Sequence, residues 1–377
     1  MGGAGATSGN GARRLLGIAR KSLVLITFIS NVLAAFALWA CCYTTTVEPE
    51  IHPRLSLVGL VFPFILLANL AFIPIWMIVK LKRCWIPIVL ILPVIGYVLD
   101  YCPVNVQREV PSDCIKLLTW NSDNYGRELG DRDSARNLTR EYIRNCDADI
   151  ICLQESNIGA KITQPLYDYT DSAGYERATY LGMVLLTRFH IINSDTIHYE
   201  SYVQGTRSHN GSMWFELEYF GDTILLVMNH LESFRLDHES RQEYNDMLES
   251  IEDMGYENIK QTGLFLSDKM IQSEALRGPQ TDSLCAFIDR HKDRPILMCG
   301  DFNDTPISFT YQQISKRLKN AYRESGRGVG ISYNQKGFWV RIDHLFVSSH
   351  WQTYKTYIDK SIDVSDHYPL VSWLKMD

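Results

Sequence analysis

The sequence predicts an α+β protein in which a soluble domain of sheets layered with helices follows a membrane-spanning N-terminal region. Residues 1–105 contain three long uncharged stretches and carry eight basic and three acidic side chains, a net charge of +5. The remaining residues carry 29 basic and 40 acidic side chains, a net charge of −11. In that second part, short apolar runs typical of buried strands alternate with helical patterns. The shift in charge and hydropathy therefore marks a domain boundary near residue 105.

Composition excludes several classes of protein. With 377 residues and 46% hydrophobic side chains, the chain exceeds one average domain and has ample apolar material for a packed core. Its nine cysteines form no C-x-x-C pair and show no zinc-binding spacing. Neither a structural zinc cluster nor a dense disulfide framework is expected.

The first residues show no signal for a folded element. Residues 1–12 are rich in Gly, Ala and Ser, and four basic residues follow before position 22, so residues 1–21 are expected to form a disordered, basic N-terminus. Ala6 stands where an N-myristoylation signal requires Ser or Thr, which argues against that lipid anchor.

Residues 22–105 are expected to form a transmembrane region with spans at about 22–42, 55–79 and 84–100. The first two are uncharged and long enough to cross a hydrocarbon core of about 30 Å. A cleaved signal peptide is the alternative for the first, but its apolar region would be shorter and a second, longer span would not normally follow. The third is short, and its two prolines indicate a kinked helix or an interfacial segment.

The distribution of basic residues predicts the orientation of these spans. Four basic residues precede the first span, one lies in the first loop, and three lie in the second loop, so the N-terminus and the second loop are expected in the cytoplasm. Three crossings would place residues 106–377 outside the cytoplasmic membrane, whereas two would leave them inside. We expect a multi-pass protein with three crossings, anchored in the lipid bilayer, and infer no obligate protein partner.

The soluble part is marked by apolar runs that each deliver a polar side chain. Pro295–Ser308 is the clearest case, because Gly300 allows a turn and Asp301 and Asn303 then project to the same side. A polar turn capping a core strand would explain this run alone. Four other runs carry residues of the same kind: Glu155, His230, Asp343, and the pair Asp366 and His367. A shared site explains five such runs better than chance does.

Other patterns complete the expected domain. Residues 114–121 and 182–188 are typical of strands, 133–146 of an amphipathic helix, and 280–291 of a helix leading into the Asp301 strand. Residues 234–276 are polar, acidic and helical in pattern, so they are interpreted as an insertion, either a solvated surface excursion or a lid that selects substrate.

These motifs resemble the endonuclease/exonuclease/phosphatase superfamily, the DNase I-like enzymes, from about residue 115 to the C-terminus. Six ordered motifs support the resemblance: Leu118-Thr-Trp-Asn121, Leu153-Gln-Glu155, Asn229-His-Leu231, Gly300-Asp-Phe-Asn303, Arg341-Ile-Asp343 and Ser365-Asp-His367. The resemblance implies that residues 106–377 form a four-layer α/β/β/α sandwich, with the catalytic site at one end of two face-to-face sheets.

The resemblance also implies roles for the residues in these motifs. Asn121, Glu155 and Asp366 offer only oxygen ligands, which suit Mg²⁺ or Mn²⁺. Asp301 would orient or deprotonate the attacking water, and Asn303 would hold that water or the phosphate. His367 would contact the scissile phosphate with its tautomer set by Asp343, and His230 would bind phosphate or act as general acid. DNase-type members place a carboxylate behind the mid-chain His, and the sequence assigns none to His230.

The expected activity is divalent-metal-dependent hydrolysis of a phosphoric ester, most simply a phosphodiester. A soluble part of net charge −11 lacks the basic footprint of most nucleic-acid enzymes, and membrane tethering favours a lipid headgroup as substrate. Nucleic acid remains the other candidate substrate, since a local groove can be basic. Two further alternatives are a phosphomonoesterase and an inactive, membrane-tethered binding module; every charged position of the six motifs is filled, which favours an enzyme.

Overall fold

A computed structural model of the chain describes residues 6–126, 132–156, 160–199, 210–234, 256–335 and 338–377. The chain divides into two compact units. One unit comprises residues 1–44 and 58–98, and the other comprises residues 45–57 and 99–377. The boundary predicted near residue 105 therefore lies close to the observed division, but the loop between the first two apolar stretches belongs to the second unit.

The described part of the first unit is helical. Its elements are α1 (Ala6–Thr44), η1 (Leu57–Val61), α3 (Phe62–Lys80), η2 (Leu81–Arg83), α4 (Trp85–Ile91), η3 (Leu92–Val94) and the start of α5 (Ile95–Tyr101). Two stretches, Arg13–Thr44 and Pro53–Arg83, are long and apolar enough to cross a membrane, and Trp85–Tyr101 is a shorter apolar stretch. The two long stretches are consistent with a membrane anchor.

Buried polar side chains join α1 to α3 inside this unit. The indole Nε1 of Trp76 donates to Asn31 Oδ1 at 3.0 Å, and Asn69 Nδ2 donates to the carbonyl of Ala34 at 2.9 Å. Such bonds between apolar helices fix their pairing, because lipid offers no competing partner.

Two features of this region differ from or refine the expectations. Helix α1 begins at Ala6, so the described part of the segment expected to be disordered is helical and continuous with the first span. The third apolar stretch is broken into α4, η3 and α5 around Pro93, as its prolines predict.

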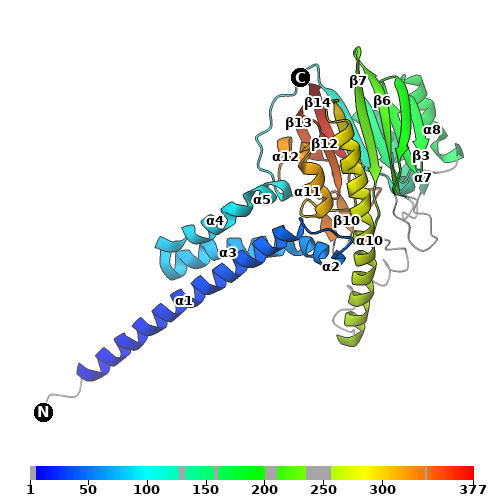
Figure 1. Ribbon diagram of the computed structural model, residues 1–377. Helices are drawn as coiled ribbons and strands as arrows, with labels where there is room; N and C mark the ends of the chain where they lie inside the picture. The colour runs from blue at the N-terminus through cyan, green and yellow to red at the C-terminus, as the bar shows by residue number, and fades with distance from the viewer. Residues whose placement is uncertain (1–5, 127–131, 157–159, 200–209, 235–255, 336–337) are drawn as a thin grey trace. The chain divides into compact units, whose positions relative to one another are not determined.

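The second unit contains two six-stranded sheets and a hairpin (Figure 1). The first sheet has the order β13-β14-β1-β2-β4-β3, with strands β13 (Trp351–Ile358), β14 (Leu370–Met376), β1 (Ile115–Asn121), β2 (Ile150–Gln154), β4 (Met183–Thr187) and β3 (Glu176–Tyr180). The second has the order β5-β6-β7-β8-β12-β9, with strands β5 (Ile191–Ile197), β6 (Gly211–Tyr219), β7 (Asp222–His230), β8 (Ile296–Asp301), β12 (Asp343–Val347) and β9 (Lys319–Asn320). The hairpin pairs β10 (Tyr333–Gln335) with β11 (Phe338–Val340).

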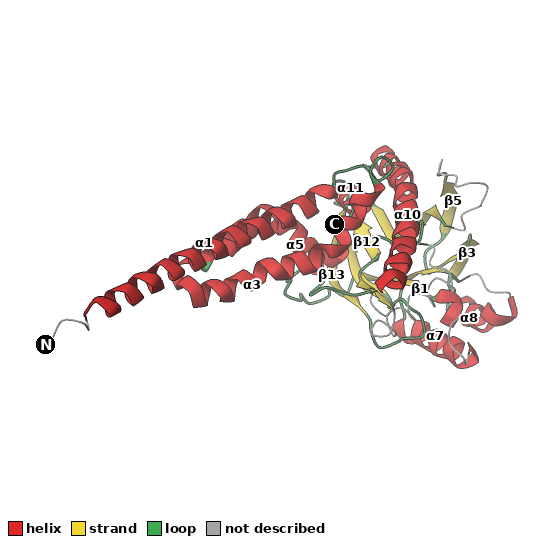
Figure 2. Cartoon of the chain, turned by 90° about the horizontal axis from the view of Figure 1, so that it is seen from below, coloured by secondary structure: helices red, strands yellow, loops and turns green. Residues whose placement is uncertain are grey.

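The two sheets pack face to face, with helices on their outer faces (Figure 2). The inner core combines Leu117 and Cys152 of one sheet with Leu226 and Leu297 of the other, all fully buried. The remaining helices are α6 (Asp123–Gly126), α7 (Arg132–Cys146), α8 (Ala160–Ser172), α10 (Tyr256–Arg290), α11 (Phe309–Ser315), α12 (Ala321–Ser325) and α2 (Pro53–Ser56). Helices α7 and α8 cover the first sheet, and α10 and α11 cover the second. The predicted sandwich of two sheets between helices is confirmed.

Most predicted elements of this unit are present within a residue or two of their expected bounds. The exception is the insertion at 234–276, of which residues 235–255 lie outside the described residues. From Tyr256 onward, the insertion and the helix predicted at 280–291 form one continuous element, α10.

Two segments next to the apolar helices are built into the second unit. Helix α2 packs on α10, and a Cβ atom placed on Gly278 of α10 would lie 3.4 Å from the backbone nitrogen of Glu50. At the end of α5, Asp100 forms an ion pair with Arg323, and its carbonyl accepts a hydrogen bond from Arg341. Both segments therefore contribute to the fold of the layered domain.

Candidate active site

Strand register brings three predicted site residues together in the second sheet. Strand β8 lies between β7, to which it is parallel, and β12, to which it is antiparallel. His230 is the register partner of Asp301 on one side, and Asp343 is its partner on the other. The polar residue that ends each apolar run therefore reaches the same edge of the sheet.

Gly300 makes this close approach possible. Its φ of +133° is one that residues with side chains rarely adopt, and a Cβ atom there would lie 2.0 Å from the carbonyl oxygen of Asn229. Any side chain at this position would push β7 away from β8 and separate His230 from Asp301.

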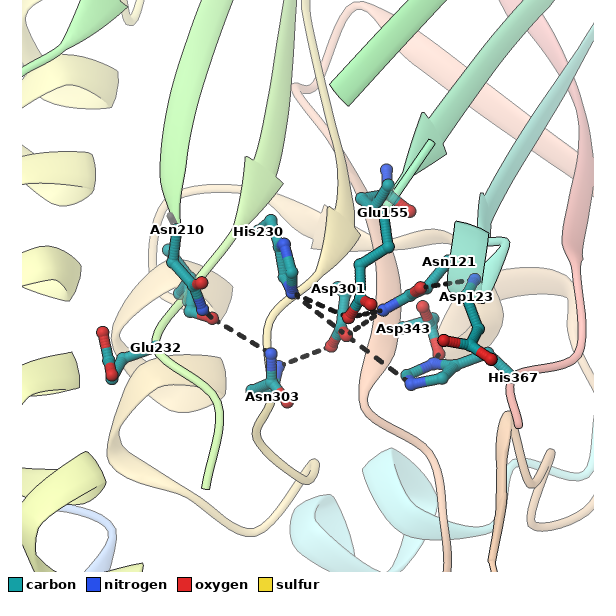
Figure 3. A network of polar contacts seen from close by, with 12 residues as sticks. Asn121, Asp123, Glu155, Asn210, His230, Glu232, Asp301, Asn303, Asp343 and His367 are labelled. Carbon is teal, nitrogen blue, oxygen red and sulfur yellow. Dashed lines mark hydrogen bonds and ion pairs between the residues drawn. The ribbon is translucent and has the colours of Figure 1, made fainter. Parts of the chain in front are cut away.

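Asn121 joins the two sheets across the site (Figure 3). It ends β1 of the first sheet, and its Nδ2 lies 3.1 Å from Glu155 Oε1 and 3.1 Å from Asp301 Oδ2. Glu155 directly follows β2 and has a φ of +47°, a costly conformation that turns its side chain out of the strand path. One amide thus spans two carboxylates that come from opposite sheets.

His367 lies between two carboxylates. Its Nδ1 is 2.8 Å from Asp343 Oδ2, and its Nε2 is 3.7 Å from Asp301 Oδ2. Burial alone would lower the pKa of His367, but Asp343 and Asp301 outweigh burial and raise it to about 10. The imidazole therefore carries a positive charge at neutral pH, with its orientation fixed by Asp343.

Asp301 is almost fully enclosed, with 1% of its surface exposed. Burial raises its pKa to about 6, against the opposing effects of His367, His230 and the Asn121 amide. Its Oδ1 accepts a hydrogen bond of 2.8 Å from the backbone of Asn303, whose own side chain donates to the carbonyl of Leu231 at 3.0 Å. A carboxyl with a pKa near 6 can exchange a proton near neutral pH, as a general base must.

His230 faces two carboxylates of the site, those of Glu155 and Asp301. Its Nε2 lies 3.8 Å from Glu155 Oε1 and 3.9 Å from Asp301 Oδ2, and it makes no hydrogen bond to a described residue. A buried, unbonded ring nitrogen aimed at two acids is available to a ligand. The described contacts of His230 include no carboxylate within hydrogen-bonding distance.

The residues of the site fit a divalent cation. Carboxylate oxygens of Asp301 and Asp343 lie within 4.8 Å of each other, and the Glu155 carboxylate reaches the Asn121 amide beside them. Several carboxylates at such short range are stabilised by a bound cation, and carboxylate and amide oxygens are the donors that Mg²⁺ and Mn²⁺ prefer. No thiol lies among these donors, which agrees with the choice of a hard cation.

The structure brings most predicted site residues into one network of side-chain contacts. The position of Asp366 is instead defined by contacts of Ser365 and of the Asp366 backbone. Ser365 donates through Oγ to the carbonyl of Asn121 at 2.8 Å, which fixes this loop against the end of β1. The carbonyl of Asp366 accepts from Asn334 of the β10–β11 hairpin at 2.8 Å. The roles assigned to all eight residues stay predictions.

Two residues at the site, Asp123 and Tyr333, were not predicted. Asp123 has 4% of its surface exposed and lies in a turn where four consecutive residues have positive φ, close to Asn121 and His367 (Figure 3). Its spacing of two residues from Asn121 matches that of Asp301 and Asn303, and this pattern could have identified it. The ring of Tyr333 packs edge-on against His367 with centroids 4.9 Å apart. Nothing in the sequence around Tyr333 predicts that contact.

Comparisons with known proteins agree with this architecture. The model described as the Endonuclease/Exonuclease/phosphatase family matches residues 118–251 and 284–367, and a model described as a domain of unknown function matches residues 21–101. No curated protein sequence matches the chain.

Solved structures of similar fold are distant in sequence. The human Nocturnin catalytic domain with bound sulfate is 17% identical, with a TM-score of 0.49, over 71% of this chain and 97% of its own. Truncated Caenorhabditis elegans TDP2 is 16% identical, with a TM-score of 0.46, over 71% and 99%. An endonuclease/exonuclease/phosphatase from Beutenbergia cavernae is 13% identical, with a TM-score of 0.48, over 70% and 72%.

Proposed function

The chain belongs to the endonuclease/exonuclease/phosphatase family, and we propose that it is a membrane-anchored, divalent-metal-dependent phosphodiesterase. The observation that carries the proposal is the line of buried groups from Asp343 through His367 to Asp301, beside the Asn121 and Glu155 pair. Members of this family hydrolyse phosphoric esters, and a site for that reaction needs positive charge for the phosphoryl oxygens and a base for water.

Each residue has a role that its geometry supports. Asp301 accepts the proton of the attacking water, because its pKa of about 6 allows both protonation states. Asn303 holds that water or the phosphate. His367 presents Nε2–H to a phosphoryl oxygen, while Asp343 fixes the ring through Nδ1. His230 offers its unbonded Nε2 to the phosphate or the leaving group.

The metal ligands are Asn121, Glu155 and Asp366. A divalent cation bound there would supply charge stabilisation for the phosphoryl oxygens. The carboxylate excess of the site favours such a cation, and Mg²⁺ or Mn²⁺ suits the oxygen donors.

A lipid headgroup is the favoured substrate class. The part of the chain after residue 105 has a net charge of −11, which opposes a long nucleic-acid footprint, and an anchor holds the site near a lipid surface. Nucleic acid is the competing class, and the two differ in their response to salt.

A substrate panel at two salt concentrations tests this function with the full-length protein in detergent micelles. We expect hydrolysis of bis(p-nitrophenyl) phosphate and of a phospholipid or sphingolipid diester with Mg²⁺ or Mn²⁺, and loss of both with EDTA. Raising salt from roughly 50 to 200 mM should leave lipid turnover unchanged, because nucleic-acid binding depends on counterion release and lipid contact does not. Metal-independent turnover, or preference for a phosphomonoester, would contradict the proposed phosphodiesterase. DNA cleavage without lipid turnover would make nucleic acid the substrate.

We further propose that the chain crosses the membrane three times and carries its catalytic domain outside the cytoplasm. The basic residues of the N-terminus and second loop favour the cytoplasm for both. The packing of α2 on α10 supports the same topology. Because residues 45–57 and the catalytic domain share one unit, they lie on the same side of the membrane. The chain between them must therefore cross the membrane and cross back.

Reporter fusions check this topology. Alkaline phosphatase fused after Tyr101 is expected to be active, because that enzyme matures only outside the cytoplasm, and a fusion after Lys82 is expected to be inactive. The Lys82 fusion is the matched control, one apolar stretch away. The reverse pattern would place the catalytic domain in the cytoplasm.

A further inference from the structure

A fully buried arginine on α10 stands outside the roles assigned above. Arg277 has 0% of its surface exposed, and a buried guanidinium persists only where its charge and donors are used. It donates through Nη2 to Glu274 on its own helix, and the ring of Phe234 lies 4.6 Å from its central carbon. Two further contacts of Arg277 lead to the loops that carry the catalytic residues.

The first contact holds the loop after β7. Arg277 Nη1 donates to the carbonyl of Glu232 at 2.7 Å, and the amide of Glu232 donates to Gln280 Oε1 at 3.0 Å. One turn of α10 therefore binds both backbone groups of a residue that lies two positions after His230. These two hydrogen bonds fix the direction in which the chain leaves β7.

The second contact holds the loop after β8. Arg277 Nε lies 3.7 Å from Asp304 Oδ2, and Asp304 directly follows Asn303. The carbonyl of Asp304 accepts a hydrogen bond of 2.9 Å from Nε2 of the buried His344. Burial lowers the pKa of His344 to about 3, so this ring is neutral and serves as a donor. Asp304 is thus hydrogen-bonded through its backbone carbonyl and faces Arg277 across an ion pair through its side chain.

Two buried carboxyl groups, those of Glu274 and Asp304, depend on Arg277 as their ion-pair partner. Glu274 and Asp304 are both buried against this single guanidinium, and burial raises the pKa of each carboxyl, to about 8 for Glu274. Removing Arg277 would leave the two buried acids without the side chain that both of them contact. A lysine would keep the charge but could not reach both loops, because its ammonium lacks the planar fork of a guanidinium.

The other side of the same turn meets the loop between the first two apolar stretches. A Cβ atom on Gly278 would lie 3.4 Å from Glu50 N and 3.6 Å from Pro49 Cδ. Glu48 and Glu50 also raise the pKa of Asp282, after burial itself, which places these acids near α10. Residues 45–57 therefore lie against α10 at the turn that carries Arg277.

We propose that Arg277 is a positioning residue that aligns the loops of His230 and Asn303, and that residues 45–57 hold its helix turn in place from behind. The inference rests on the proposed function for its kinetic consequence. It makes the catalytic geometry dependent on residues 45–57, which lie between the first two apolar stretches and belong to the same compact unit as the site.

Two pairs of variants of the full-length protein in detergent micelles test the proposal. Arg277→Lys should lower kcat for bis(p-nitrophenyl) phosphate by about 10- to 100-fold, since small misplacement of catalytic groups has effects of that size, with KM and the Mg²⁺ requirement unchanged. Its control is Arg317→Met. This change breaks the partly exposed ion pair between Arg317 and Asp289, which lies on the same helix as Arg277, and it should leave kcat unchanged. Gly278→Leu should lower kcat by displacing residues 45–57, whereas Gly263→Leu, on the same helix with open space around it, should not.

Amide hydrogen exchange separates this proposal from the proposed function. Arg277→Lys and Gly278→Leu should speed exchange in residues 229–233 and 301–305, with β1 and β2 unchanged, whatever the substrate is. If the wild-type protein hydrolyses no ester but these segments respond, the phosphodiesterase assignment fails and the positioning role stands. If the wild-type protein is active while Arg277→Lys retains both its kcat and its exchange rates, the positioning role is refuted. An unchanged kcat in Gly278→Leu would show that residues 45–57 have no part in positioning the two loops.

Discussion

Replacing Asp301 by Asn is expected to lower kcat by at least ~10², because it removes a buried carboxyl that contacts both histidines of the site. The change is nearly isosteric and keeps the backbone bond to Asn303 possible, so the fold should survive. The amide cannot accept a proton from water, and it also removes the negative charge opposite His367. The measurement is initial-rate kinetics of the full-length protein on bis(p-nitrophenyl) phosphate with saturating Mg²⁺.

Asp222→Asn is the matched control for that change. Asp222 begins the neighbouring strand β7 at its far end and is exposed, so its loss should leave the rate within twofold of the wild-type rate. A wild-type rate in Asp301→Asn would show that another group takes the proton, and the assignment of Asp301 as base would have to be abandoned.

Replacing Asp343 by Asn is expected to lower kcat by about 10²–10⁴, the range seen when a catalytic histidine loses its orienting carboxylate. Asp343 is the largest of the influences that raise the pKa of His367, so its loss should also lower that pKa. A ring that is less firmly protonated and has no fixed orientation presents a proton to the phosphate only part of the time. The measurement is kcat as a function of pH, together with the titration of the His367 ring by NMR.

A second histidine–carboxylate pair on the surface provides the control for Asp343. Glu176 Oε1 lies 2.7 Å from His190 Nδ1, and both side chains are exposed. Glu176→Gln breaks that pair without touching the site and should leave kcat unchanged. If Asp343→Asn lowers the melting temperature but leaves kcat intact, the Asp343–His367 pair is structural rather than catalytic.

The fold and the composition of the site were largely readable from the sequence because both depend on short-range patterns. Buried strands produce apolar runs, and a site at the ends of such strands must place its polar residues just after them, as at Asp301 and His230. Pro93 marked the break in the third apolar stretch because it lacks an amide hydrogen. The start of α1 at Ala6 escaped prediction, since a helix anchored by tertiary or membrane contacts continues into residues whose composition alone favours disorder.

Arg277 and Asp123 were not predicted, for different physical reasons. A buried arginine in a polar, acidic segment has the same appearance as a solvated one, because only its tertiary partners distinguish them. Asp123 owes its place to a turn of positive φ angles that no side-chain pattern encodes. The docking of residues 45–57 on α10 joins positions more than two hundred residues apart, and no local periodicity reports such a contact.

That docking also orders events during synthesis. Residues 45–57 emerge from the ribosome long before α10, so this loop has no binding surface until that helix has been made. Under the proposed three-crossing topology, a chain whose first two apolar helices inserted in the inverted orientation would place the loop and α10 on opposite sides of the membrane, and α10 would fold without it. Under that topology, the contact at Gly278 couples completion of the layered domain to the insertion of the helices that precede it.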